Sequence, residues 1–255
     1  MRRVISIMTF DLHSTAYGWL MLSGIFVSIV LWSRVARRDS RLVVIYIAAL
    51  AGAFFGAKII YFAAEGWLRW HDANRWIVLA TGKSVTGALL GGYAAVEAAK
   101  RLMNYRFATG DWFAVIAPLG IMLGRVGCIL QGCCLGRECA PSWFTMNDAS
   151  GLARWPAALV ELLFNALMLG VVLFLRWRKA LPGQHFHIYL MAYGIFRFIH
   201  EFVRDTPRVL GPISGYQIAA LGVALLGAIG FHLRRRQSKP RTDSITFAAS
   251  QERLI

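Results

Sequence analysis

Residues 112–136 read WFAVIAPLGIMLGRVGCILQGCCLG, and the part from Gly124 onward holds one arginine, four glycines and three cysteines. The apolar run before it is long enough for a membrane-spanning helix, which needs about 20 residues. Arginine stays charged in any protein environment, so at this depth Arg125 must be paired or face a polar cavity. Glycines beside it let another backbone or a ligand approach closely. The stretch therefore predicts both a transmembrane helix and a functional site.

The whole chain has the composition of a polytopic membrane protein. Its 255 residues are 57% hydrophobic and only 16% charged, whereas soluble domains carry about 25% charged residues. Apolar stretches of membrane-spanning length predict about seven spans, at 16–34, 43–63, 77–98, 112–131, 156–175, 185–203 and 214–233. Lys83 interrupts the third span. Lipid satisfies no backbone hydrogen bonds, so the predicted fold is an all-α transmembrane helical bundle.

The net charge of +15 is explained by membrane topology rather than by a nucleic-acid partner. Lys and Arg concentrate in alternate loops, and the positive-inside rule then predicts an outside N-terminus and a cytoplasmic C-terminus. The basic clusters lie at 34–41, 100–106, 176–179 and 234–241. We expect one transmembrane catalytic domain over 1–236, followed by a flexible cytoplasmic tail over 237–255. The loop at 135–154 is the longest on the outer side and is typical of a lid or an interfacial segment.

A polar stripe runs down one face of the sixth predicted span. Tyr193, Arg197, Glu201 and Arg204 recur at i, i+4, i+8 and i+11. Such a stripe can be an internal ion pair that fixes helix packing, or a cationic pocket in which Glu201 orients the arginines around a phosphate. Arg125 on another span favours the pocket, because one glutamate cannot neutralise three arginines.

The four cysteines cluster near the outer end of the fourth span and leave three interpretations open. Their spacing, C-x4-CC-x4-C, is not a usual zinc pattern. They could form a disulfide through Cys139 in the oxidising exterior, pack as small apolar residues, or act as nucleophiles or metal ligands. We assign no metal site and no cofactor from sequence. Nearby histidines are treated as satisfied or interfacial side chains, at His185, His187 and His200.

Several short blocks of this sequence, taken in their order along the chain, resemble the prolipoprotein diacylglyceryl transferase family. The longest are residues 124–127 (GRVG), with Gly132 and Gly136 behind them, and residues 193–204 (YGIFRFIHEFVR). The resemblance covers about residues 10–235. Shorter matches support it, namely Tyr17-Gly18, Gly56-Ala57-Lys58 with Tyr61, residues 86–91 (TGALLG), Trp155-Pro156 with Glu161, and residues 215–217 (GYQ).

The resemblance implies a multi-pass enzyme of the bacterial inner membrane that uses two substrates. One is phosphatidylglycerol, whose diacylglyceryl group is transferred; the other is a prolipoprotein signal peptide, whose lipobox cysteine thiol accepts it. Arg125 and Arg197 would bind the phosphate, where charge develops, with Glu201 and Arg204 holding them. Tyr17 and Gly136 match family positions important for activity. The remaining matches would contact substrate or leave room for membrane lipid, at Lys58, Tyr61, Thr86, Gly87, Gly91 and Gly132.

This sequence departs from the family where the acceptor thiol would be activated. Where the family has a histidine, this sequence has Thr86, and threonine cannot act as a general base near neutral pH. Cys128 replaces the asparagine that follows Gly-Arg-x-Gly in the family, and Cys133 replaces a glutamate after it. Lys58 replaces an arginine of the second span. We therefore expect Cys128, Cys133 or Lys58 to assist proton removal. Two alternatives remain: a phospholipid-dependent transferase with another acceptor and a cysteine relay, or a non-catalytic lipid-binding or redox protein.

Overall fold

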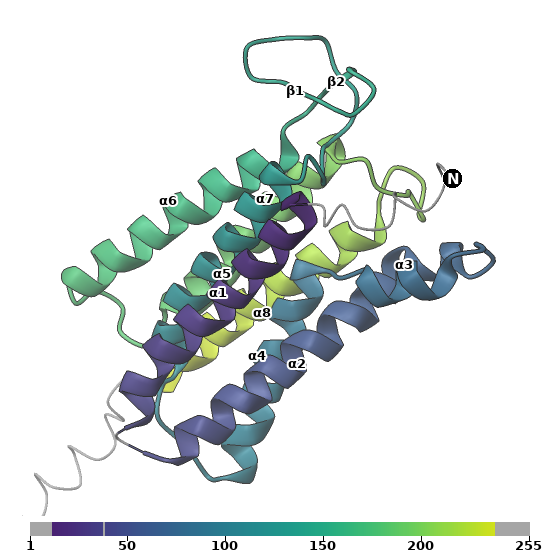
Figure 1. Cartoon of the computed structure of the whole chain (residues 1–255). Helices are drawn as coiled ribbons and strands as arrows, with labels where there is room; N and C mark the ends of the chain where they lie inside the picture. The colour runs from purple at the N-terminus through teal and green to yellow at the C-terminus, as the bar shows by residue number, and fades with distance from the viewer. Residues whose placement is uncertain (1–11, 38, 238–255) are drawn as a thin grey trace, which may run out of the picture.

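The computed structural model describes the backbone of residues 12–37 and 39–237 and the side chains of residues 18–37 and 39–235. The predicted all-α architecture is confirmed within these ranges, with one short hairpin added (Figure 1). The elements are α1 (Leu12–Ala36), α2 (Arg41–Ala64), the 3-10 turn η2 (Gly66–Arg69), α3 (Arg75–Thr81), α4 (Val85–Leu102), α5 (Gly110–Leu130), β1 (Met146–Asn147), β2 (Ala153–Arg154), α6 (Ala157–Trp177), α7 (His185–His200), η3 (Glu201–Val203) and α8 (Gly215–Gln237). The predicted tail lies outside the described residues from 238 onward.

Five of these helices are long and apolar enough to cross a membrane, which supports a polytopic membrane protein. They comprise Gly18–Ala36, Arg41–Ala64, Gly110–Leu130, Ala157–Trp177 and Gly215–Arg235. Large apolar side chains such as Phe54, Phe55 and Leu167 are at least 60% exposed on them, as lipid-facing residues should be.

The third and sixth predicted spans have different bounds from those expected. The segment 77–98 is not one helix, because the chain breaks between α3 and α4. Ser84 starts α4 as its N-cap, and its hydroxyl accepts a hydrogen bond from the Gly87 backbone N–H at 3.2 Å. The sixth predicted span, 185–203, is the helix α7, which has 16 residues and ends at His200, where the 3-10 turn η3 begins. Apolar composition alone did not reveal either helix end.

Helices α2 and α4 pack backbone against backbone through glycines. A Cβ added at Gly91 would lie 2.2 Å from the Gly52 carbonyl oxygen, and one at Gly56 would lie 2.4 Å from the Gly87 oxygen. Gly52 and Gly56, like Gly87 and Gly91, are four residues apart and share a helix face. The expectation that Gly87 and Gly91 leave room for lipid is therefore wrong, because α2 fills that space.

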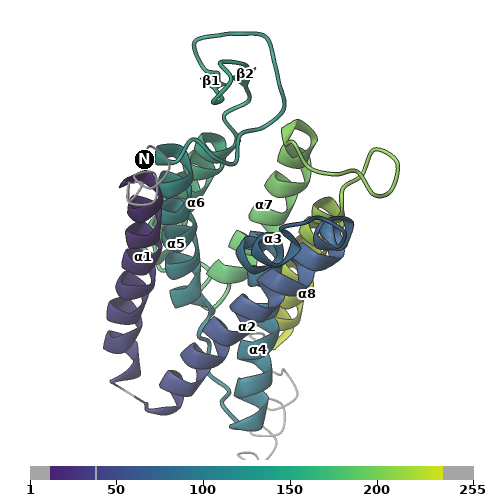
Figure 2. The same cartoon turned by 45° about the vertical axis from the view of Figure 1, so that its right-hand side comes forward.

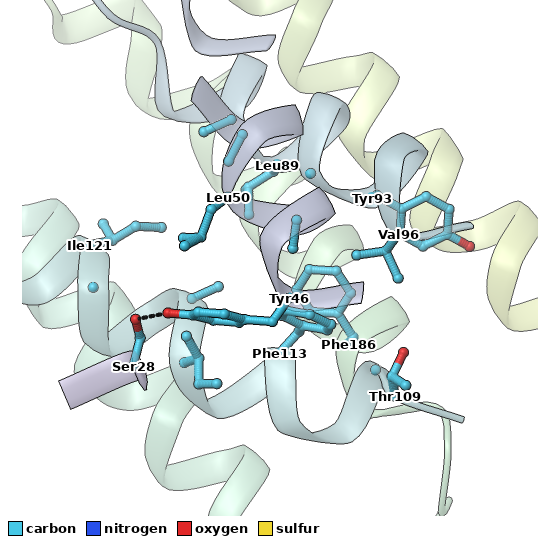
Figure 3. A pocket seen from close by; sticks show the side chains of 18 of the residues that line it. Ser28, Tyr46, Leu50, Leu89, Tyr93, Val96, Thr109, Phe113, Ile121 and Phe186 are labelled. Atoms are coloured by element: carbon cyan, nitrogen blue, oxygen red, sulfur yellow. Dashed lines mark hydrogen bonds between the residues drawn. The ribbon is translucent and has the colours of Figure 1, made fainter. Parts of the chain in front are cut away.

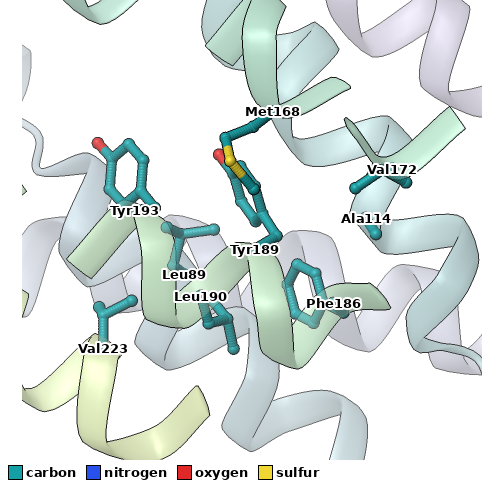
Figure 4. Packing of buried hydrophobic residues seen from close by; sticks show 9 residues of the cluster. All are labelled: Leu89, Ala114, Met168, Val172, Phe186, Tyr189, Leu190, Tyr193 and Val223. Atoms are coloured by element: carbon teal, nitrogen blue, oxygen red, sulfur yellow. The ribbon is translucent and has the colours of Figure 1, made fainter. Parts of the chain in front are cut away.

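The buried core centres on α7 (Figure 4). Phe186, Tyr189, Leu190 and Tyr193 of this helix pack against residues from α4, α5, α6 and α8. Figure 2 shows α1, α5 and α6 side by side, with the β1–β2 hairpin projecting beyond the helix ends. We call this the hairpin end of the bundle. Polar residues at the end of α7 consequently lie among several helices at the hairpin end.

Candidate active site

Three arginines and two glutamates meet at the hairpin end, from α5, α6 and the end of α7. The Glu161 carboxylate oxygen Oε2 lies 2.9 Å from Arg125 Nη2, 3.1 Å from Arg197 Nη1 and 3.8 Å from Arg204 Nη1. Glu201 Oε2 lies 2.9 Å from Arg197 Nη2 and 3.5 Å from Arg204 Nε. We call these five residues the arginine cluster. Both glutamates are 0% exposed, so their charges are held by the arginines rather than by water.

The arginine cluster keeps a net positive charge of one, from three cations and two anions. The stripe predicted Arg197, Glu201 and Arg204 together, and the structure confirms that Arg125 joins them. Glu161 is the member that spacing did not assign. It lies 36 residues before Arg197 on another helix, and only its place in the family-like Trp155-Pro156 block marked it. Its other oxygen, Oε1, accepts a hydrogen bond from the Tyr193 hydroxyl at 2.8 Å.

Arg204 has buried donors to spare. Its side chain is 13% exposed, and its Nε and Nη1 atoms make ion pairs at long range but no hydrogen bond with the described residues. A buried guanidinium with unused N–H groups costs free energy, and a bidentate oxyanion would remove that cost. The cluster can therefore bind a phosphate.

His200 lies beside the cluster, packed against Trp155 and Phe196. The Trp155 indole N–H donates to His200 Nε2 at 3.2 Å, and Phe196 stacks on the imidazole at 5.0 Å. Because Nε2 accepts, the neutral ring carries its proton on Nδ1, which is buried without a hydrogen-bond partner in the described part of the chain. The expectation that His200 is a satisfied or interfacial side chain therefore does not hold for its Nδ1 atom.

Cysteine thiols lie directly against Arg125. The Sγ atoms of Cys128, Cys133 and Cys134 all lie within 4.8 Å of one another. Arg125 Nη1 donates to Cys128 Sγ at 3.8 Å. Cys128 is buried, Cys133 partly buried and Cys134 exposed, so the group runs from the cluster to the surface. All four cysteines, Cys139 included, carry free thiols, so the disulfide interpretation finds no support.

The end of α5 explains how these cysteines meet. Gly132 has φ +63°, the left-handed conformation that commonly stops a helix. Its N–H donates to the Ile129 carbonyl at 3.1 Å, and the Cys133 N–H donates to the Cys128 carbonyl at 3.0 Å. These two bonds form a Schellman motif. The chain therefore turns back over its last helical turn and brings Cys133 and Cys134 to Cys128.

An apolar cavity of about 350 Å³ opens below the cluster, among α1, α2, α4, α5 and α7. Figure 3 shows Leu50, Leu89, Ile121 and Phe113 around it, with a hydrogen bond between Ser28 and Tyr46 at one side. Ile121 lies about one helical turn before Arg125. On α5 the lining extends from Ile121 to Gly110, about 16 Å at 1.5 Å per residue. On α5 the cavity therefore begins about one helical turn from Arg125 and extends towards the other end of the bundle, and none of the five cluster residues lines it.

Comparison with known proteins agrees with this geometry. The family model for prolipoprotein diacylglyceryl transferase matches residues 3–233. The chain belongs to the prolipoprotein diacylglyceryl transferase family. A phosphatidylglycerol–prolipoprotein diacylglyceryl transferase from Mannheimia succiniciproducens is 30% identical over 87% of this chain and 88% of its own length. Proteins of the same name from Bordetella avium and Pasteurella multocida are 31% and 32% identical, over 74% and 70% of this chain and 76% and 70% of theirs. These findings favour the family's transferase activity over both alternatives.

Lys58 of α2, which the resemblance matches to an arginine, does not join the arginine cluster. Its Nζ donates to the carbonyl oxygens of Leu79 at 3.1 Å, of Gly82 at 2.8 Å and of Ala80. An ammonium group has three N–H donors, and here all three bind backbone at the end of α3. Lys58 therefore stabilises the break between α3 and α4. A charged amine in this position has no lone pair with which to remove a proton from a thiol.

Other predicted substrate contacts of this transferase-family chain also lie at that break. The Tyr61 ring packs so closely on Gly82 that a Cβ there would come within 2.1 Å of it. The Thr86 hydroxyl is hydrogen-bonded with Ser84 Oγ at 2.7 Å, and the residue is 1% exposed. Gly87 belongs to the α2–α4 contact. The side chain of Tyr17 lies outside those that the structure describes.

Gly136, the last family-like position, holds the loop against the cluster. It forms an antiparallel bridge with Arg204. A Cβ on it would lie 2.5 Å from the Val203 carbonyl oxygen and 2.8 Å from Trp155 Cβ. Only glycine fits this crossing. The structure thus gives Gly136 a positioning role between the hairpin loop and the segment that carries Arg204.

Proposed function

We propose that this protein transfers the diacylglyceryl group of phosphatidylglycerol to the lipobox cysteine thiol of a prolipoprotein. The thiolate sulfur attacks the glycerol carbon that bears the phosphate ester. A carbon–sulfur bond forms, the carbon–oxygen bond breaks, and glycerol phosphate leaves with the electron pair. The observation that carries the proposal is the buried arginine cluster, with its net positive charge and the unused donors of Arg204.

The arginine cluster suits the charge change in this reaction. A phosphate diester with one negative charge becomes a monoester with up to two, so the transition state gains charge on the leaving oxygens. Arg125, Arg197 and Arg204 provide guanidinium donors that are already oriented by Glu161 and Glu201, and such preorganised donors stabilise developing charge. Because the cluster is buried, the interaction is screened far less than in water.

The apolar cavity provides a place for the acyl chains of the lipid. Its volume of about 350 Å³ lies within the range of small-molecule pockets, about 300–1,000 Å³. It starts a helical turn from Arg125 and runs along α5 in the direction in which acyl chains would extend. We assign it to the acyl chains of phosphatidylglycerol, with the headgroup at the arginines.

The topology that we propose keeps seven crossings in one catalytic domain over 1–236. Helices α4 and α7 are the two crossings added to the five apolar ones, and both are packed among other helices rather than exposed to lipid on all sides. The N-terminus and the hairpin then face outward, and the basic ends face the cytoplasm. In the bacterial inner membrane, this arrangement presents the arginine cluster to a signal peptide whose lipobox lies near the outer surface.

Reconstituted protein tests the reaction. Vesicles of phosphatidylglycerol labelled in the headgroup, supplied with a lipobox peptide, should release labelled glycerol phosphate and yield diacylglyceryl peptide. Arg125→Ala and Arg197→Ala should each lose most of this activity, whereas Arg178→Ala, outside the cluster, should keep it. Release that depends on neither cluster arginine would overturn the proposal, as would the absence of product under conditions where a known family enzyme works.

A further inference from the structure

The three thiols at the end of α5 have the arrangement of a metal site. Cys128, Cys133 and Cys134 hold their sulfur atoms within 4.8 Å of one another. Zinc with bonds of about 2.3 Å to sulfur requires about 3.8 Å between the sulfurs of a tetrahedral site. Shifts of about 1 Å would therefore suffice to form the site. In the turn beyond the helix, Cys133 is partly buried and Cys134 is exposed, so an ion can enter from the surface.

We propose that Cys128, Cys133 and Cys134 bind a zinc ion with one coordination position open, and that this ion takes up the acceptor thiol. The inference rests on the proposed function and names how its acceptor is activated. Structural zinc sites use four protein ligands, whereas catalytic ones use three and leave the fourth position to water or substrate. The three sulfurs are the only such group of His, Cys, Asp and Glu ligands found among the described residues.

Charge favours zinc over copper(I) at this place. Three thiolates with Zn²⁺ carry a net charge of −1, which balances the net +1 of the adjacent arginine cluster. Three thiolates with Cu⁺ would carry −2. Both ions are soft enough for thiolate ligands, but zinc has no redox chemistry and accepts a fourth ligand readily. The contact between Arg125 and Cys128 Sγ, at 3.8 Å, joins the two charged groups directly.

The position also fits the reaction. Zinc at about 2.3 Å from Cys128 Sγ lies no more than about 6 Å from Arg125 Nη1, the guanidinium proposed to bind phosphate. In phosphatidylglycerol the attacked carbon is separated from phosphorus by a single oxygen. A thiol on zinc would therefore be a close neighbour of the carbon that it must attack.

Zinc would supply the thiolate, for which the described residues considered above, Thr86 and Lys58, offer no base. Thr86 has its hydroxyl bonded to Ser84, and Lys58 donates to three carbonyls. A thiol that coordinates zinc is deprotonated, and its proton passes to bulk water. The bound sulfur then attacks carbon, the carbon–oxygen electron pair leaves with glycerol phosphate, and the thioether product dissociates. Zinc remains Zn²⁺ throughout, so no oxidant or reductant is consumed.

Metal analysis of the purified full chain is the first test. After dialysis, the wild type should retain about one zinc per chain. The triple variant Cys128→Ser, Cys133→Ser, Cys134→Ser should lose it, and Cys139→Ser should keep it as the matched cysteine control. A wild type that binds no zinc, or only Cu⁺, would overturn the inference, as would equal zinc content in the triple variant.

Cobalt substitution tests the open position without any mutation. The Co²⁺ form should show sulfur-to-metal charge-transfer absorption that changes when a lipobox peptide is added, but not when its cysteine is replaced by serine. An identical spectrum with both peptides would overturn the claim that the acceptor thiol binds the metal.

Wild-type protein stripped of metal should lose activity at least about tenfold and regain it with Zn²⁺. Full activity without zinc would refute the inference and leave the proposed function standing. A zinc site that responds to the thiol peptide, with no lipidated product formed, would refute the proposed function and leave the zinc site standing.

Discussion

Glu161→Gln removes one of the two anions of the arginine cluster while keeping the size of the side chain. The carboxylate is 0% exposed and lies 2.9 Å from Arg125 and 3.1 Å from Arg197. Removing one partner of a buried ion pair costs about 3–5 kcal/mol, because the remaining charge is left uncompensated. For a chain of this size, that free energy corresponds to a melting temperature lower by about 6–20 °C. The amide oxygen can still accept from Tyr193, so the loss reports the charge rather than that hydrogen bond.

Thermal unfolding in detergent provides the assay, with Glu65→Gln as the matched control. Glu65 accepts a hydrogen bond from the Tyr216 hydroxyl at 3.0 Å, as Glu161 does from Tyr193, but lies outside the arginine cluster. Its variant should stay within about 1 kcal/mol of wild type. Added phosphatidylglycerol should restore part of the Glu161→Gln loss, because its phosphate neutralises the arginines, while phosphatidylcholine should restore less. Equal melting temperatures for the two variants would refute the reasoning.

Three further predictions concern other parts of the molecule. Arg204→Ala should leave the melting temperature nearly unchanged, since its Nε and Nη1 make no hydrogen bond in the described structure, but should lower kcat/KM for glycerol phosphate release about 100-fold; a loss of stability without a loss of rate would contradict this. Gly91→Ala should destabilise the α2–α4 contact by about 1–3 kcal/mol, measured by thermal unfolding, whereas Gly170→Ala, with open space around it, should not. The pKa of Asp148 lies below its usual range because the Ser150 hydroxyl and Arg154 bind its carboxylate. The bonds of the Asp148 carboxylate therefore stabilise the hairpin fully above about pH 4, the ordinary pKa of an aspartate, and this stabilisation is lost as the pH falls. Limited proteolysis of the hairpin should become faster in acid for the wild type, whereas the rate for Asp148→Asn should not depend on the protonation of this carboxyl.

The sequence contained most of the fold because lipid imposes simple rules. Length and apolar composition predict a span correctly where one uninterrupted helix is long enough to cross the membrane, as in α2, α5 and α6. The third span was misread because Ser84 caps a new helix and Lys58 binds the end of the preceding one. The Lys58 bonds join residues more than 20 positions apart, and the Ser84 cap is a polar signal, so apolar composition records neither.

The candidate site was predictable where its residues share a helix face. Arg197, Glu201 and Arg204 follow helical spacing, and an arginine inside an apolar run marked Arg125. Glu161 was not assigned from spacing, because it reaches the cluster from another helix. Cys128 and Cys133 were already candidates, but the meeting of the three sulfur atoms was not predictable from spacing. Cys128 and Cys133 would lie on different faces of a continuous helix, and they meet because Gly132 ends α5 in a reversing turn.

A structure determined with phosphatidylglycerol bound tests the central claim most directly. The account predicts phosphate oxygens within hydrogen-bonding distance of Arg204 Nε and Nη1 and of the Arg125 guanidinium, with acyl chains in the cavity beside α5. It would be contradicted by a lipid whose phosphate lies elsewhere while the three arginines remain paired only with Glu161 and Glu201.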